Sequence, residues 1–174
     1  MGVKHDFVEL DGVESQIVRA GIDYWRGLKG GRCFPTPRRG LPREIGHLLR
    51  HAALVKVIDS GEEYEFRIFG DAHTKATSLN MQGSQLRDLS RISPSIAASW
   101  RRLYDTVRAT RQPFALRALR DDCPGDKPLI ASENVLLPLG RSEACVDHIL
   151  VFSEYAHPSP TGSVPISARH SITV

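Results

Sequence analysis

Two histidines, His47 and His51, are the first residues whose type and spacing could do chemistry. They lie four residues apart, so a helix would place both imidazoles on one face, as zinc-binding helices do. Zinc sites use at least three protein ligands, and no third residue of a suitable type lies nearby in the sequence. We therefore interpret both residues as surface histidines and predict no metal site.

Catalytic motifs are missing from the sequence. It contains no GxSxG nucleophile elbow, no HExxH pair, no GxxxxGK[ST] phosphate loop and no GxGxxG dinucleotide motif. The expected strands supply Glu133, Asp147 and His148 as acid or base candidates, but these fall on mixed faces. We therefore expect a protein that is not an enzyme. The alternative is an enzyme with a cone-shaped antiparallel sheet around an Asp or His base.

A clearer chemical signal is a pair of polar residues within an apolar strand. Because side chains alternate along a strand, Ser132 and Asn134 share one face of residues 129–139, and Glu133 with Val135 lies on the other. Both faces are mostly apolar, so the pattern leaves open which one faces the helices. If the Asn134 face is inward, the two polar side chains would orient a small ligand in an apolar pocket. Alternatively, Asn134 hydrogen-bonds a loop backbone.

Aromatic and apolar residues would complete such a pocket. Alternation places Tyr64, Phe66 and Ile68 on the core face of a second strand. Trp100 either contacts a ligand or a partner, or is buried in the core or in a dimer interface. His148, in the last strand, is either a polar group of the pocket or a residue facing solvent. The predicted ligand-binding set is Tyr64, Phe66, Ile68, Trp100, Ser132, Asn134 and His148.

The elements that must position these residues follow from periodicity. Residues 53–70 alternate and contain a Ser-Gly turn, which predicts a β-hairpin. Residues 94–111 begin with Pro after a Ser and carry an apolar stripe, which predicts a long helix. Three further strands are expected from Phe114, Leu129 and Cys145. This order predicts an α+β fold in which helices flank one antiparallel sheet.

These patterns divide the chain into four parts. Residues 1–31 are expected to form an N-terminal helix with its lead-in, and residues 32–52 a proline-rich connector with a short helix. Residues 53–155 are expected to form the core of a single domain. Residues 156–174 are rich in Ser and Pro and predict a flexible tail.

Composition narrows the class of protein. Lys and Arg number 23 against 20 Asp and Glu, so the net charge of +3 is too small to favour nucleic acid or a membrane surface. Three cysteines without a CxxC pair suit a reducing compartment. No signal peptide and no apolar run of membrane-spanning length is found. We expect a cytoplasmic protein with neither a nucleic-acid nor a membrane partner.

Several segments, taken in order, resemble the PAS domain family, and more narrowly its small stand-alone members that are widespread in alphaproteobacteria. They are YWRGLKGGR at 24–32, HAALVKVID at 51–59, YEFRIFGDA at 64–72, NMQGSQLRDL at 80–89, and NVLLPLG at 134–140 followed by HILVFSEY at 148–155. The resemblance implies a PAS-like five-stranded antiparallel sheet flanked by helices, with an extra N-terminal helix outside the core. It also implies homodimerisation and a bacterial role in sensing or in protein–protein signalling.

Two departures from better-known PAS types bear on cofactors. Flavin-based light sensors of this fold use a reactive cysteine in the helical middle, and residues 71–111 contain none. Haem-binding relatives commonly use a histidine on the long helix; residues 94–111 have none, and only His73 could substitute. The resemblance therefore argues against flavin-adduct chemistry and against haem, and it leaves the cofactor unknown.

These observations together predict a non-catalytic PAS-type sensory or regulatory domain. It would bind a small molecule in its core, signal through contacts with a protein partner, or do both. The alternative is a ligand-free dimerisation or adaptor module, in which bulky side chains such as Phe66, Phe114 and Phe152 fill the core.

Overall fold

The computed structural model describes residues 4–37, 41–120 and 130–156. The strands form one antiparallel sheet in the order β1-β4-β5-β6-β2-β3. Their bounds are β1 (Lys4–Val8), β2 (Ala52–Ile58), β3 (Glu63–Phe69), β4 (Phe114–Arg120), β5 (Ile130–Leu139) and β6 (His148–Ala156). The helices are α1 (Gln16–Lys29), α2 (Leu41–Glu44), α3 (Asp71–Thr77), α4 (Leu86–Ile92) and α5 (Pro94–Thr110). The α+β class with a single antiparallel sheet is therefore confirmed.

The expected count of five strands is wrong, because β1 adds a sixth at the edge of the sheet. β1 pairs along its whole length with β4, from Lys4 opposite Leu119 to Val8 opposite Ala115. Its sequence, KHDFV, has no apolar alternation, and Phe7 is 67% exposed. The strand forms because β4 offers a free row of backbone donors and acceptors, a long-range feature that local sequence does not encode.

A β-bulge in the hairpin changes which aromatic residues face the core. Ala53 pairs with Phe69 but Val55 pairs with Phe66, so β3 has one extra residue between these two pairs. Phe66 and Phe69 consequently lie on one face and are buried, whereas Ile68 turns to the other face and is only half-buried. The prediction that Ile68 shares the face of Tyr64 and Phe66 is therefore wrong.

Helix α1 covers one face of the sheet, which we call the α1 face. Ser15 caps the helix by accepting a hydrogen bond from the Val18 amide at 3.1 Å, so α1 begins at Gln16, within the expected residues 1–31. Trp25 on this helix donates its indole N–H to the Pro138 carbonyl of β5 at 2.8 Å. The helix approaches the sheet so closely that a Cβ on Gly21 would lie 2.2 Å from the Phe152 ring.

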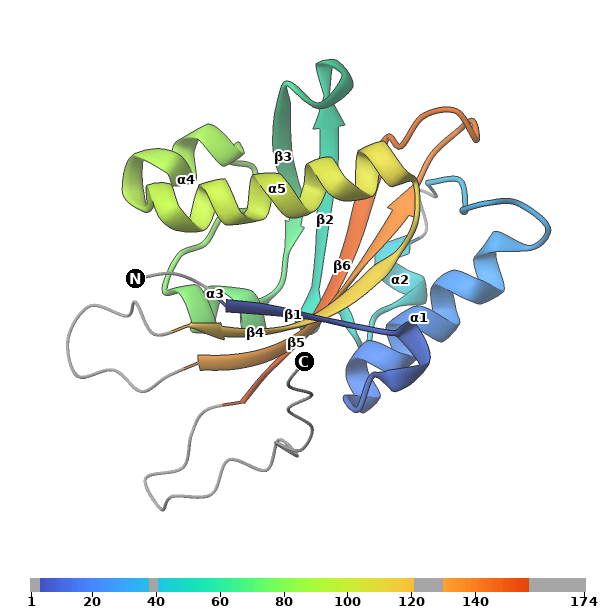
Figure 1. Ribbon diagram of the computed structural model, residues 1–174, viewed down its shortest axis with the longest axis horizontal. Helices are drawn as coiled ribbons and strands as arrows, with labels where there is room; N and C mark the ends of the chain where they lie inside the picture. The colour runs from blue at the N-terminus through green and yellow to red at the C-terminus, as the bar shows by residue number, and fades with distance from the viewer. Residues whose placement is uncertain (1–3, 38–40, 121–129, 157–174) are drawn as a thin grey trace, which may run out of the picture.

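Helices α3 and α5 cover the opposite face, which we call the pocket face. Figure 1 shows α5 extended across the sheet, with α3 and α4 on the side where α5 begins and α1 with α2 on the other. α5 has Pro94 in its first turn and buries Ile96, Ala97, Tyr104 and Val107. No helix in the described part of the chain is long and apolar enough to cross a membrane.

The structure describes most of the predicted connector, but almost none of the predicted tail. The short helix expected within residues 32–52 is present as α2 and a 3₁₀ turn at Leu49–His51. The predicted tail, residues 156–174, lies outside the described residues except for Ala156, which ends β6. The last five strands and α3 to α5 lie within residues 52–156.

Candidate functional site

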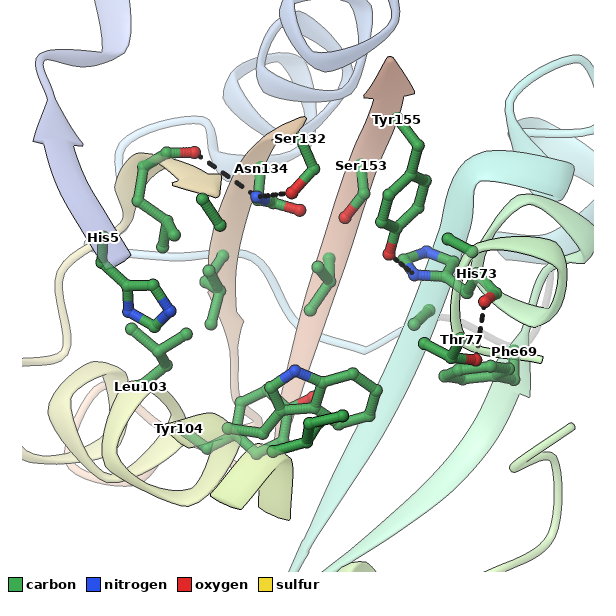
Figure 2. Close-up of a pocket in the computed structure, with 18 residues that line it drawn as sticks. His5, Phe69, His73, Thr77, Leu103, Tyr104, Ser132, Asn134, Ser153 and Tyr155 are labelled. Carbon is green, nitrogen blue, oxygen red and sulfur yellow. Dashed lines mark hydrogen bonds between the residues drawn. The ribbon is translucent and has the colours of Figure 1, made fainter. Parts of the chain in front are cut away.

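A cavity of about 100 Å³ lies between the pocket face of the sheet and helices α3 and α5. Figure 2 shows His5, Ser132, Asn134, Ser153 and Tyr155 reaching it from the strands, with Leu103 and Tyr104 on the helix across from them. The lining is mostly apolar and consists of His5, Ala53, Phe69, His73, Ala76, Thr77, Ile96, Trp100, Leu103, Tyr104, Leu116, Ala118, Ser132, Asn134, Leu136, Val151, Ser153 and Tyr155.

The space exists because small side chains occupy the middle of the sheet. In one row across the strands, the paired residues Ala118 on β4 and Ser132 on β5 are small, and the larger Tyr155 beside them on β6 has its hydroxyl at His73. The next row pairs Asn134 with Ser153. Alanine and serine do not reach the helices above them, so α5 and α3 close over a gap.

Aromatic rings form the wall opposite these small residues. The Trp100 ring of α5 lies 5.7 Å from Phe66 and 6.3 Å from Phe69, measured between ring centroids. Phe69 in turn lies 5.2 Å from the imidazole of His73. The Phe66–Trp100 contact is edge-to-face and the other two are tilted. Such ring contacts favour particular orientations, so the wall has a defined shape without a ligand.

Asn134 and Ser132 form the polar part of the sheet wall. The Asn134 side-chain nitrogen donates to Ser132 Oγ at 2.9 Å and approaches the Leu116 carbonyl at 3.5 Å. Asn134 therefore faces the cavity from within the sheet, and its partners are a strand hydroxyl and a strand carbonyl. The open question of orientation is settled in favour of the inward Asn134 face, and the alternative of a loop partner is wrong.

His73 and Tyr155 form a buried hydrogen-bonded pair beside this row (Figure 2). The Nε2 atom of His73 lies 3.0 Å from the carbonyl oxygen of His51, which can only accept, so Nε2 carries the ring proton. Burial lowers the pKa of His73 from 6.5 to about 4, so the ring is neutral at pH 7. Nδ1 is then an acceptor, and the Tyr155 hydroxyl donates to it at 2.9 Å.

The cavity wall is electrically neutral. Within the described residues its lining has no Asp, Glu, Lys or Arg side chain. Burial, and then the nearby guanidinium of Arg102, lowers the pKa of His5, whose Nε2 lies 3.3 Å from Ser99 Oγ. Burial also raises the pKa of the Tyr104 hydroxyl, which keeps it protonated. The site is suited to hydrogen bonding and apolar contact, without a formal charge at neutral pH.

The structure brings together only part of the predicted ligand-binding set. Trp100, Ser132 and Asn134 line the cavity. Phe66 supports the ring of Trp100 from behind, and Tyr64 lies farther along β3, where its hydroxyl donates to Asp105 at 2.5 Å. Neither of these two β3 residues lines the cavity.

Ile68 and His148 lie on the α1 face, away from the cavity. His148 pairs across the sheet with Leu139 and Lys56, and it follows Asp147 at the start of β6. Burial lowers the pKa of its imidazole. Since alternate residues of β6 point to opposite faces, it is Ser153 and Tyr155, five and seven positions later, that reach the pocket face.

Sequence reasoning missed several lining residues for identifiable reasons. His5 belongs to the unexpected strand β1, and His73, on α3, was considered only as a substitute haem ligand. Ser153 and Tyr155 could have been found, because they share one face of the expected last strand and face Asn134 and Ser132 in an antiparallel pairing. The missing information was the register between these two strands.

The acidic residue nearest the site has a structural role on the other face. Glu133 accepts the backbone N–H groups of residues 14 and 15 at 3.0 and 2.6 Å and the Arg117 Nε at 3.0 Å. These contacts fasten the start of α1 to β5. Glu133 and Arg117 also line a second, more open hollow of about 330 Å³ at the ends of β5 and β6. The two side chains form an ion pair with each other there.

Within residues 4–37, 41–120 and 130–156, no three His, Cys, Asp or Glu side chains are grouped as metal ligands. His51, one of the two spaced histidines, directs its Nδ1 toward the Ser153 carbonyl at 3.1 Å and so links the chain before β2 to β6. No family model matches the chain, and comparison with curated proteins and with solved structures gave no match.

Proposed function

We propose that this protein is a non-catalytic sensory or regulatory domain of the PAS type that binds a small molecule in the cavity between α5 and the sheet. The observation that carries the proposal is a partly open, mostly apolar cavity into which Ser132, Asn134 and Ser153 present polar atoms. Apolar walls with a few convergent hydrogen-bonding groups are the usual composition of small-molecule sites.

The PAS-type assignment rests on the sequence segments together with the order of elements. A hairpin, a helical middle and three further strands follow one another, and one sheet results with helices against it. The added strand β1 departs from the five-stranded pattern that the resemblance implies. It extends the sheet beyond β4 and supplies His5 to the cavity, so it modifies the site without replacing the pattern.

Signalling would follow from the position of α3. This helix contributes His73, Ala76 and Thr77 to the lining, and it ends at Ser78 in a left-handed conformation. A ligand that contacts α3 differently in two packings would shift the population between them, which requires unequal affinity for the two states. A second copy of the chain or another signalling protein in the cytoplasm would then recognise the altered surface.

Two rival functions fit the described residues less well. A fully packed adaptor would have no cavity; Phe66 and Phe152 are buried in the core, yet a space of about 100 Å³ remains between α5 and the sheet. An enzyme would need an acid and a base in one cavity. The cavity lining contains no carboxylate among the described residues, and Glu133 is bonded to the start of α1.

A native mass spectrum of the purified protein, beside a denatured one from the same sample, tests the proposal. We expect native masses above whole multiples of the chain mass, because a ligand bound between α5 and the sheet would be retained during purification. The excess should disappear in Ala53→Leu, where the added atoms enter the cavity, and persist in Ala98→Leu, the same change at an exposed position of α5. No excess in the wild-type protein, or an excess unaffected by Ala53→Leu, would favour the ligand-free adaptor.

A further inference from the structure

The chemistry of the cavity wall is specific enough to name a class of ligand. We infer that the cavity takes an uncharged molecule with one aromatic ring and one hydroxyl group, such as a phenol. This inference rests on the proposed function, because it assumes that the cavity is a binding site. Three properties of the lining carry it: its lack of charge, its size, and the separation of a hydrogen-bonding side from an aromatic side.

The first property is the absence of a partner for a charged ligand. The described lining contains no acidic or basic side chain other than His5 and His73. His73 is 3% exposed, and both of its ring nitrogens are occupied by Tyr155 and by the His51 carbonyl. A carboxylate or an ammonium group would lose its hydration here without gaining an opposite charge, which is strongly unfavourable.

The second property is size. The cavity measures about 100 Å³. An engineered protein cavity of about 150 Å³ with apolar walls holds one benzene molecule. The present cavity is smaller than that one but is partly open to solvent, so one ring with a small substituent is an upper limit on the group that it takes, and a fused-ring cofactor does not fit.

The third property is the separation of a hydrogen-bonding side from an aromatic side. The hydrogen-bonding side is formed by the strands. The Leu116 carbonyl can only accept, so the Asn134 atom facing it is the amide nitrogen, and Asn134 Oδ1 is left as an acceptor. Ser132 Oγ accepts from Asn134 and keeps its own proton to donate. Ser153 is 1% exposed, and its side chain lines the cavity beside Asn134. A ligand hydroxyl both donates and accepts, so it can bond Asn134 Oδ1 and a serine together, whereas a carbonyl would leave Asn134 Oδ1 unsatisfied.

The aromatic side faces these groups across the cavity. Phe69 and Trp100 lie with centroids 6.3 Å apart, and Tyr104 of α5 completes the wall. A flat ring beside them would gain edge-to-face and offset contacts that a saturated ring of the same volume lacks. The ligand is therefore oriented with its hydroxyl toward β5 and β6 and its ring toward α5.

Calorimetric titration of the wild-type chain with phenol, toluene, cyclohexanol and benzoate tests this inference. Phenol is expected to bind at one site per chain. Toluene, which lacks the hydroxyl, should bind about tenfold more weakly, as expected for the loss of one buried hydrogen bond. Cyclohexanol, which lacks the aromatic ring, should bind about fivefold more weakly. Benzoate should not bind.

Two variants locate the binding. Ser153→Ala removes a hydroxyl from the cavity wall, so it should weaken phenol about fivefold and leave toluene unchanged, whereas Ser95→Ala on the exposed side of α5 should change neither. Equal affinities for phenol and toluene, or measurable affinity for benzoate, would overturn the inference. If cyclohexanol or benzoate binds more tightly than phenol, and Ala53→Leu abolishes that binding, the inference about the ligand class fails. The proposed function stands in that case, because the cavity still binds a small molecule. If none of the four binds, the inference fails, and the native mass spectrum decides whether the proposed function fails with it.

Discussion

Acidification should destabilise this protein through one buried histidine, His73. Its imidazole is enclosed between α3 and β6, donates from Nε2 to the His51 carbonyl and accepts at Nδ1 from the Tyr155 hydroxyl. Protonation of Nδ1 would place two donors face to face and bury a positive charge. No carboxylate is hydrogen-bonded to this ring within the described residues, so nothing compensates that charge.

The magnitude follows from the lowered pKa. The unfolded chain takes up the proton near pH 6.5, but the folded chain does so only near pH 4, so between these values the unfolded state binds more protons. Stability is therefore fully present above pH 6.5 and falls as the pH falls toward 4. The loss amounts to about 2 kcal/mol at pH 5 and about 3 kcal/mol at pH 4.

Urea unfolding of the wild-type chain and of His73→Gln at pH 7 and pH 5 measures this loss. The glutamine amide can still donate to the His51 carbonyl and accept from Tyr155, but it does not titrate. The wild-type chain should lose about 2 kcal/mol more than the variant between the two pH values. His5 and His148 also have pKa values lowered by burial, and their contribution cancels in this difference. Equal losses in the two proteins, or an NMR titration midpoint of His73 near 6.5, would refute the reasoning.

Two further predictions concern the attachment of α1. Glu133→Ala removes the acceptor of two backbone N–H groups and of Arg117, and it should lower the unfolding free energy by about 3 kcal/mol, whereas Glu154→Ala, its exposed cross-strand neighbour, should change little. Gly21→Ala should lower it by about 1–3 kcal/mol, because the new methyl group meets the Phe152 ring, while Gly27→Ala, with nothing near, should raise it by about 0.5–1 kcal/mol. Urea unfolding measures both pairs, and a Gly21→Ala protein as stable as Gly27→Ala would contradict the close packing.

Local pattern was sufficient for the elements whose signals lie within a few neighbouring residues. The hairpin from Ala52 to Phe69 has its Ser60-Gly61 turn, and both turn residues adopt positive φ, at 56° and 100°. The long helix begins at Pro94 as the Ser-Pro signal indicated. In both cases the residues that set the boundary lie next to each other in the chain.

Long-range pairing explains what sequence patterns could not supply. β1 is a strand only because β4 lies beside it, and the bulge in β3 depends on how β2 and β3 register. The same limit applied to the site. Ser132 and Asn134 were identified from their own strand, but Ser153, Tyr155 and His73 join them only through the pairing of β5 with β6 and the packing of α3.

Strand β5 connects the two layers of the molecule through its alternation. Its even-numbered positions, Ser132 and Asn134, form the hydrogen-bonding wall of the cavity, and the intervening Glu133 holds the start of α1 on the opposite face. A slip of one residue in the pairing of β5 would exchange these roles, placing a carboxylate in the cavity and leaving the first turn of α1 without its acceptor. Two requirements therefore fix the register of this strand. The neutral side chains of Ser132 and Asn134 must face the cavity beneath α5, and the carboxylate of Glu133 must face the start of α1. That double requirement explains why a strand with two mostly apolar faces adopts a single orientation.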